Sequence, residues 1–356
     1  MALNYSRIGV GVIGCGKIGS LRANNASQNY AVKYLAVCDL VESKAQDVAK
    51  MWEADDWTTD YKKVIDNPQV DAIIISTTEP SHFEIIMYAL SAEKPVLVEK
   101  PIVLDLNDAK YILDVSRDKN IKLFVGYTQR FRRRFLAVKE HIVNGYINDI
   151  DSGFAKIYTP LSQGDAVLSR SPLCVPAINL LTYPIDLILW YLEDKSPKSL
   201  FAQLVSRNTK PVATWAILTF EDGTVCTLGA SRQFPRHYPA HVATMEFELF
   251  GSNGSISIDD SHRDCVLASE KPIPSPYLKE GDAKVAFLGS AMPGDWALGH
   301  FYGPMKEETN AFIESVCSGV SHPVLTTAEQ ACRTLEISHA IIQSYNSNKP
   351  VSLSIK

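Results

Sequence analysis

The first third of the chain alternates short apolar runs with stretches of helical periodicity. Short strands that alternate with helices of about 10–15 residues are typical of βαβ units and of a parallel sheet. The pattern therefore predicts an α/β domain. Its expected strands lie at residues 8–13, 32–38, 72–76, 96–98 and 123–125, and its expected helices lie at residues 20–27, 43–52, 81–92 and 105–119.

The pattern changes after about residue 127. Six apolar segments then follow with few helices between them, and Glu221-Asp222-Gly223 and residues 251–254 (Gly-Ser-Asn-Gly) are typical hairpin turns. We expect an α+β domain with a mostly antiparallel, open sheet, so residues 1–127 and 128–356 form two domains; the C-terminal helix is a candidate for packing back onto the first. The expected strands are 155–158, 199–205, 214–220, 225–230, 244–250 and 255–258, the helices are 176–191, 302–318 and 326–344, and a long loop or arm is expected over 261–300.

Composition narrows the class of protein. With 356 residues, 46% hydrophobic and 21% charged, the chain is an ordinary globular protein of two-domain size. Its net charge of −5 argues against nucleic-acid or anionic-membrane partners. The seven cysteines never form a C-x-x-C motif, which favours reduced thiols and no metal site. Without a recognisable signal peptide or an apolar run of about 18 residues, a cytoplasmic protein is expected.

A glycine-rich motif follows the first expected strand. Gly14, Gly16 and Gly19 form G-x-G-x-x-G, and Asp39 ends the next strand twenty residues later, which completes a dinucleotide-binding fingerprint. The glycines allow a tight turn, close approach to a pyrophosphate, and helix–strand packing. Asp39 would accept hydrogen bonds from ribose hydroxyls and repel a 2′-phosphate, so NAD is favoured over NADP. The predicted cofactor site also includes Lys17 and Ile18.

Two further clusters follow strand ends, where open α/β sheets bind ligands. The first contains Thr77, Thr78, Pro80 and His82, and the second is Glu99-Lys100-Pro101. Lys100 could hold or shuttle a substrate hydroxyl proton beside an oxidised nicotinamide. For His82, a capping or core role is as good an interpretation as a cofactor role.

These motifs, together with Gly126-Tyr127-x-x-Arg130-Phe131, resemble the glucose-fructose oxidoreductase / inositol dehydrogenase / MocA (Gfo/Idh/MocA) family. The resemblance implies a Rossmann domain followed by a domain whose open sheet often forms an oligomer interface, here a homodimer or homotetramer. It also implies hydride transfer between NAD(P) and a carbinol carbon, commonly of a sugar or cyclitol. Lys100 would then be catalytic, and the cofactor site would extend to Glu99 and Arg130.

The chain departs from the family's second motif. Many members carry Asp-x-x-x-His on a helix, whereas here Asn179 and Tyr183 stand in those places and Asp186 follows three residues later. Some subgroups are similar in having Tyr there. Tyr183 would act as acid/base with Lys100 as its partner, and Asn179 would bind a substrate oxygen. If one helix spans this region the two side chains share a face, although Pro184 should kink it.

Other charged residues give weaker clues to the substrate. We interpret Arg132-Arg133-Arg134 as a solvated face, and we expect Arg232 and Arg236 on the surface although either could clamp a carboxylate. His237 and Tyr238 belong to the same loop region, and residues 292–300 suit a lid or a partner-subunit contact. Cys174 is interpreted as a bystander.

Three functions remain open from the sequence. The first is an NAD-dependent dehydrogenase of a sugar, cyclitol or related polyol. The second is an oxidoreductase for a non-sugar substrate, such as a dihydrodiol, a cyclic imine or a carboxylated carbinol. The third is a dinucleotide-sensing regulator without chemistry, against which the retained Glu99-Lys100-Pro101 weighs. The family resemblance adds an NAD-using glycoside hydrolase.

Overall fold

The computed structural model describes residues 7–171, 173–236, 238–239, 243–260, 265–273, 284–287 and 293–353. The chain divides into two compact units, each made of two segments. The first unit comprises Met1–Phe131 and Trp296–Cys332, and the second comprises Arg132–Asp295 and Arg333–Lys356. The sequence had assigned residues 296–332 to the second domain, whereas in the structure they belong to the first unit.

The first unit is built on a seven-stranded sheet, sheet A, in the order β17-β6-β5-β4-β1-β2-β3. Six of its strands are parallel, and only the short β17 runs antiparallel, beside β6. The reversal of strand order between β1 and β4 is the dinucleotide-binding arrangement. The strands are β1 (Ile8–Ile13), β2 (Val32–Cys38), β3 (Asp56–Thr58), β4 (Ala72–Ile75), β5 (Val96–Glu99), β6 (Leu123–Gly126) and β17 (Thr326–Thr327).

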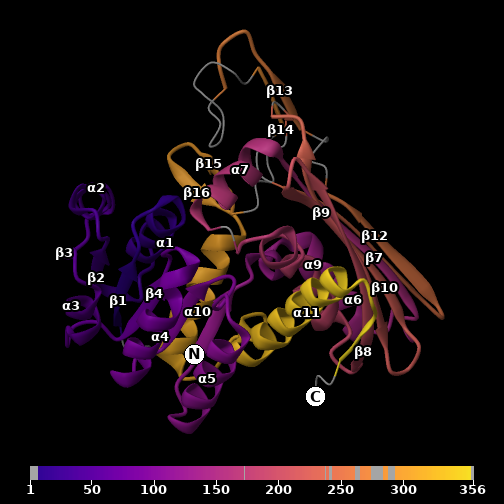
Figure 1. The fold of residues 1–356 in the computed structure, drawn as a ribbon. Helices are drawn as coiled ribbons and strands as arrows, with labels where there is room; N and C mark the ends of the chain where they lie inside the picture. Colours follow the sequence, from indigo (N-terminus) through magenta and orange to yellow (C-terminus); the bar gives the residue numbers. More distant parts are fainter. Residues whose placement is uncertain are drawn as a thin grey trace. The chain divides into compact units, whose positions relative to one another are not determined.

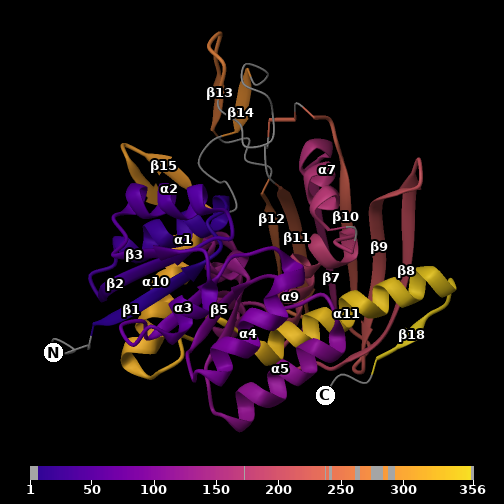
Figure 2. The same ribbon diagram turned by 60° about the vertical axis from the view of Figure 1, so that its left-hand side comes forward.

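Helices cover both faces of sheet A. On one face α1, α2 and α10 enclose an apolar core with alternate residues of β1, among them Val10 and Val12, and with Phe312 of α10. Figure 2 shows α1 and α2 on one side of β1–β3 and α3 on the other. The helices are α1 (Lys17–Ser27), α2 (Glu42–Trp52), α3 (Tyr61–Asp66), α4 (His82–Ser91), α5 (Leu106–Asp118) and α10 (Pro304–Ser318), with short 3-10 turns η1 (Glu79–Ser81) and η2 (Thr128–Phe131).

The second unit is built on sheet B, in the order β12-β11-β7-β10-β9-β8-β18. All its pairings are antiparallel except β7 with β10, so the expected mostly antiparallel sheet is confirmed. Its long strands lie side by side in Figure 1. They are β7 (Ser152–Pro160), β8 (Pro197–Arg207), β9 (Lys210–Phe220), β10 (Val225–Phe234), β11 (Thr244–Gly251), β12 (Gly254–Asp259) and β18 (Val351–Ser352).

Helices pack on one face of sheet B. Helix α7 (Leu161–Arg170) contacts β7 and β10, α8 (Pro176–Asn179) contacts β9 and β10, and α9 (Thr182–Tyr191) contacts β7 and α6 (Arg133–Val143). The last helix, α11 (Ala328–Ser347), begins in the first unit and continues into the second. Four short strands complete the described residues: β13 (Val266–Ala268), β14 (Val285–Phe287), β15 (Asp295–Ala297) and β16 (His300–Tyr302).

The expected helix over residues 176–191 is two helices. Helix α8 ends at Asn179, and the amides of Leu180 and Leu181 both donate to the Pro176 carbonyl before α9 begins at Thr182. Pro184 therefore lies in the first turn of α9, where its missing N–H is harmless, instead of kinking one continuous helix. No helix among the described residues is long and apolar enough to cross a membrane.

Candidate active site

The glycine-rich loop leaves β1 at the carboxyl edge of sheet A. Gly14 has φ +98°, and a Cβ on it would lie 2.6 Å from the Ser76 backbone. A Cβ on Gly19 would lie 1.7 Å from the Gly14 carbonyl oxygen. Both positions therefore require glycine for the fold itself, because a side chain would collide with fixed backbone.

Gly16 is different from the other two glycines. It is the exposed N-cap of α1, with φ −72° and ψ −172°, and a Cβ there would meet nothing within 4 Å. No side chain among the described residues caps this helix end, where the positive end of the helix dipole lies and favours an anion. The open space at Gly16 fits the pyrophosphate of a dinucleotide. Lys17 is exposed and Ile18 half-buried beside it.

Asp39 holds the glycine-rich loop against the end of β2. Its Oδ2 accepts a hydrogen bond from the Cys15 amide at 2.8 Å, and its Oδ1 accepts from the Val41 amide at 2.9 Å. Burial, reinforced by Asp39, raises the pKa of the Cys15 thiol to about 12, so this thiol stays protonated and unreactive. The half-buried Asp39 is close enough to the loop to shape the dinucleotide site directly.

The Thr77–His82 segment follows β4 at the same edge. Thr78 and Pro80 are exposed and Thr77 is half-buried, whereas His82 is fully buried. His82 Nδ1 lies 3.0 Å from the Pro101 carbonyl oxygen, and Nε2 lies 3.3 Å from that of Thr77. Burial lowers the pKa of His82, and the hydrogen bonds to these carbonyls oppose that shift. The imidazole links two loops of the edge, which is the structural role that the sequence left open.

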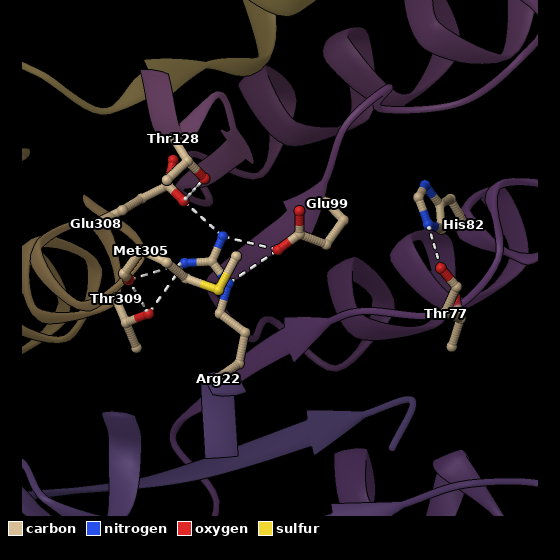
Figure 3. A network of polar contacts seen from close by, with 8 residues as sticks. All are labelled: Arg22, Thr77, His82, Glu99, Thr128, Met305, Glu308 and Thr309. Carbon is tan, nitrogen blue, oxygen red and sulfur yellow. Dashed lines mark hydrogen bonds and ion pairs between the residues drawn. The ribbon is translucent and has the colours of Figure 1, made fainter. Parts of the chain in front are cut away.

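Glu99 and Lys100 stand at the end of β5, and both are half-buried. Glu99 accepts from Arg22 of α1, whose guanidinium is fully buried (Figure 3). The same guanidinium donates to Glu308 Oε2 at 2.5 Å, and Thr128 donates to that oxygen at 2.8 Å. Burial alone would lower the pKa of Arg22, but the Glu99 and Glu308 carboxylates outweigh it and raise the pKa. The Lys100–Pro101 peptide bond is cis.

The motif after β6 lies against this buried network. A Cβ on Gly126 would come within 3.1 Å of Arg22 Nη2 and 3.2 Å of Glu99 Oε2. Arg130 is 1% exposed, and its Nη1 donates to Gln330 Oε1 at 2.9 Å. The structure thus places Arg130 in the interior of the first unit, beneath the edge that carries the other predicted cofactor residues.

In the second unit, Asn179 and Tyr183 lie on different helices. Asn179 ends α8 and is buried, and its Oδ1 accepts from Arg232 Nη2 at 3.3 Å. Tyr183 is the second residue of α9 and is half-buried. Asp186 is fully buried. The expectation that one helix face carries Asn179 and Tyr183 is therefore wrong, because the helix is interrupted between these two residues.

Two expectations for arginines are also wrong. Arg132 is buried, and both of its terminal nitrogens bind the Asp260 carboxylate, to which Arg134 also donates at 2.8 Å. The triple arginine is thus partly an internal ion-pair cluster. Arg232 is 2% exposed instead of lying on the surface. Arg236 is exposed and pairs with Asp165, as expected.

The remaining substrate clues fall partly outside the described residues. His237 and Met292 are not among them. Trp296, from the expected lid or partner segment, stacks on Trp52 of α2 with ring centroids 5.8 Å apart. Cys174 is buried and is not part of a disulfide bond. Among the described residues no group of three His, Cys, Asp or Glu side chains could hold a metal ion.

Comparison with known protein families agrees with this geometry. Residues 8–127 match the model of the Gfo/Idh/MocA oxidoreductase family, NAD-binding Rossmann fold. Residues 135–257 match the Gfo/Idh/MocA C-terminal domain. The chain belongs to this family. The resemblance of the sequence motifs, the Rossmann-like fold and the assignment to an NAD-binding oxidoreductase family are thereby confirmed.

Relatives within the Gfo/Idh/MocA family align over almost the whole chain. A myo-inositol 2-dehydrogenase from Thermotoga maritima is 23% identical over 97% of this chain and 98% of its own. An inositol 2-dehydrogenase from Rhizobium meliloti is 22% identical over 96% and 98%. The structure of a scyllo-inositol dehydrogenase from Lactobacillus casei, with NAD(H) and scyllo-inositol bound, superposes with a TM-score of 0.79 at 20% identity, covering 97% of this chain and 99% of that one.

Sequence reasoning missed the buried charges that support the family's site. Arg22, Glu308 and Asp260 were not identified as important residues from the sequence. A single sequence contains no signal that pairs Arg22 with Glu308, 286 positions away. The available signal was local: Arg22 is the one large charged residue among the otherwise small buried residues of α1, which are Gly19, Ala23, Asn24, Asn25 and Ala26.

Proposed function

We propose that this protein is an NAD-dependent dehydrogenase that oxidises a hydroxyl of a cyclitol, sugar or related polyol. The observation that carries the proposal is the open Gly16 at the uncapped N-terminus of α1, in a chain whose family is NAD-binding. Relatives of nearly full coverage named as inositol dehydrogenases support the substrate class. NAD, when bound, supplies the hydride acceptor.

The chain's own residues divide the remaining tasks. Gly14, Gly16 and Gly19 with the start of α1 would hold the pyrophosphate, and Asp39 would bind the adenosine ribose and disfavour a 2′-phosphate. This is the basis for NAD over NADP. Further cofactor contacts are proposed for the rest of the carboxyl edge: Lys17, Ile18, Thr77, Thr78, Pro80, Glu99 and Lys100. The buried His82 and Arg130 are proposed to hold this part of the cofactor site in place.

Lys100 and Tyr183 are proposed to handle the proton of the reacting hydroxyl. Tyr183 would take the proton as general base, while the Lys100 ammonium would orient the hydroxyl and stabilise the phenolate. Asn179 cannot titrate, so its role is to bind a substrate oxygen. Support for this division comes from the family motif and from the half-buried state of both residues.

A cofactor-coupled absorbance screen with NAD⁺ tests the proposal. The panel contains inositols, sugars, sugar acids, dihydrodiols and cyclic amines, and Lys100→Met and Tyr183→Phe are measured alongside. We expect NADH formation from polyols that Lys100→Met abolishes, and a rate that rises with pH. Full activity of Tyr183→Phe would remove the tyrosine from the mechanism. Activity confined to dihydrodiols or amines would favour a non-sugar substrate, and NADH binding without turnover would favour a regulator or hydrolase.

A homo-oligomer formed through sheet B is also proposed. One face of this sheet carries Trp215, Ile217, Val225 and Phe250, each more than a third exposed. The pairing of β9, β10, β7 and β11 puts these four side chains on the same face. An exposed apolar surface of this kind is typical of an interface. Light scattering of the protein and of Trp215→Glu tests it, with a smaller assembly expected for the variant.

A further inference from the structure

Arg232 of β10 is a buried guanidinium for which the described residues supply no carboxylate partner. Its Nη2 donates to the Cys174 carbonyl at 2.6 Å and to Asn179 Oδ1 at 3.3 Å. Its Nε and Nη1, which carry three further N–H donors, have no acceptor among the described residues. No described carboxylate pairs with it. Three of the five N–H donors of this side chain therefore remain unused by the described residues.

Two other buried arginines are neutralised by carboxylates. Arg22 lies between Glu99 and Glu308, and Arg132 binds Asp260. Burial lowers the pKa of Arg232 to about 10, whereas the two carboxylates raise that of Arg22. An unpaired buried charge destabilises a fold, so its presence needs a compensating ligand or function.

Two neighbouring strands add unpaired hydroxyls to the same face of sheet B. Thr214 pairs in register with Ala230, and Ser231 pairs with Tyr158 of β7. Because successive side chains alternate between faces, Thr159, Thr214 and Arg232 point to the face that α7 and α8 cover. The hydroxyls of both threonines are buried and have no partner among the described residues.

Helix α7 packs closely against the Arg232 side chain. A Cβ on Gly164 would lie 2.9 Å from Arg232 Cδ, so the arginine stem packs directly against the helix backbone. The neighbouring Gln163 also has a buried Oε1 without a described partner. The guanidinium is thus held by its stem and by Asn179, in a group of buried polar atoms that the described chain leaves unsatisfied.

We propose that Arg232 binds a carboxylate of the substrate, so that the substrate is a polyol acid rather than a neutral polyol. The proposal rests on the proposed function, because it takes Asn179, the hydrogen-bond partner of Arg232, as a substrate-binding residue. One unpaired guanidinium balances one negative charge, which favours a carboxylate over a doubly charged phosphate. The nearby Arg236 already pairs with Asp165 and is exposed. Thr159 and Thr214 supply donors for the remaining carboxylate oxygen.

The test compares sugars that differ only in the charged group. NAD⁺-dependent oxidation of glucuronate, glucose and glucose 6-phosphate is measured for the protein, for Arg232→Met and Arg232→Lys, and for Arg207→Gln as control. Arg207 is exposed and binds only Gln233 among the described residues. We expect glucuronate to have the highest kcat/KM. Arg232→Met should raise the KM for glucuronate by about 10- to 100-fold, much more than it raises the KM for glucose, whereas Arg207→Gln should leave both nearly unchanged.

A binding measurement separates this proposal from the proposed function. The shift in Tm produced by glucuronate, glucose and glucose 6-phosphate in the presence of NADH is recorded for the unaltered protein, because NADH cannot accept a hydride and no oxidation occurs. A shift confined to glucuronate supports the carboxylate site even if no sugar is oxidised. Oxidation of neutral polyols with no binding or inhibition by glucuronate overturns the site and leaves the dehydrogenase standing. A preference for glucose 6-phosphate overturns the carboxylate in favour of phosphate. These outcomes need only an intact Arg232, so they hold even if Arg232→Met does not fold.

Discussion

The Arg22 guanidinium donates two hydrogen bonds to a single carboxylate oxygen of Glu99, from Nε at 2.9 Å and from Nη2 at 2.7 Å. Glu99 ends β5 and immediately precedes Lys100. The helix that begins at the glycine-rich loop is thereby fastened to the strand end that presents the proposed catalytic lysine. Two motifs far apart in the sequence thus share one buried arginine.

Removing this arginine should destabilise the first unit strongly. Arg22→Met leaves Glu308 buried without its cation, and breaking a buried pair in this way costs about 3–5 kcal/mol. Urea unfolding measures the loss. The control is Lys33→Gln in the exposed Lys33–Asp71 pair, which should cost less than about 1 kcal/mol. A double variant with Glu308→Met should lose less than the sum of the single variants, and strict additivity would show that the two residues do not interact.

The glycines of the motif should separate into structural and ligand-binding positions. Gly16→Ala has room and ordinary backbone angles, so its stability should change by less than about 0.5 kcal/mol while NADH binding weakens. Gly19→Ala collides with the Gly14 carbonyl oxygen and should cost at least about 2 kcal/mol. Thermal unfolding and NADH fluorescence titration check both variants. Undiminished NADH binding by Gly16→Ala would contradict the proposed pyrophosphate position.

The prediction for Asp39 has a close structural control. Asp39→Ala removes the acceptor of the Cys15 amide and the proposed ribose contact, so NADH should bind more weakly and NADPH relatively better. Asp55 Oδ2 likewise accepts from a backbone amide at 2.8 Å, that of Leu35 in the middle of β2. Asp55→Ala should therefore affect stability alone. If the unaltered protein already binds NADPH more tightly, the preference for NAD is wrong.

One exposed turn should contribute to the loss of stability in acid. The hydrogen bond from Lys195, helped by the Thr224 amide, lowers the pKa of Asp222 to about 2 from its ordinary 3.8. The Asp222 carboxylate therefore binds a proton less readily in the folded state than in the unfolded state. Its contribution to the free energy of unfolding is complete above pH 3.8 and is lost as the pH falls towards 2. The difference in unfolding free energy between the protein and Asp222→Asn should shrink over that range. A difference independent of pH would mean that the lysine contact does not form in solution.

The predicted elements of the first unit were close to the observed ones because its buried strands are continuous apolar runs. Residues 8–13 and 32–38 were predicted as strands and are β1 and β2. Helix α7 was missed because its sequence contains Gly164 and few apolar residues; the close approach of Arg232 explains that glycine. The requirement for glycine at position 164 exists only once sheet B has formed and placed Arg232 against α7.

Charged residues were predicted less well, because their environment is decided by distant partners. Arg132 was assigned to a solvated face, yet it binds Asp260, 128 residues further along the chain. The break before α9 had a visible cause in Pro184, but whether the helix bends or ends there depends on packing. The candidate active-site residues were predicted from sequence motifs. The burial of Arg232 could be recognised only in the folded sheet.

The division of the first unit into two segments has a consequence for how the protein can be made. During synthesis, α10 leaves the ribosome long after the six parallel strands of sheet A. Arg22 therefore cannot pair with Glu308 until most of the chain has been made. β17, which completes the sheet beside β6, follows later still. An expressed fragment that stops at residue 131 would therefore contain every glycine of the cofactor motif and yet lack the carboxylate that neutralises its buried arginine. Loss of residues 296–332 would thus damage the unit whose other segment begins the chain.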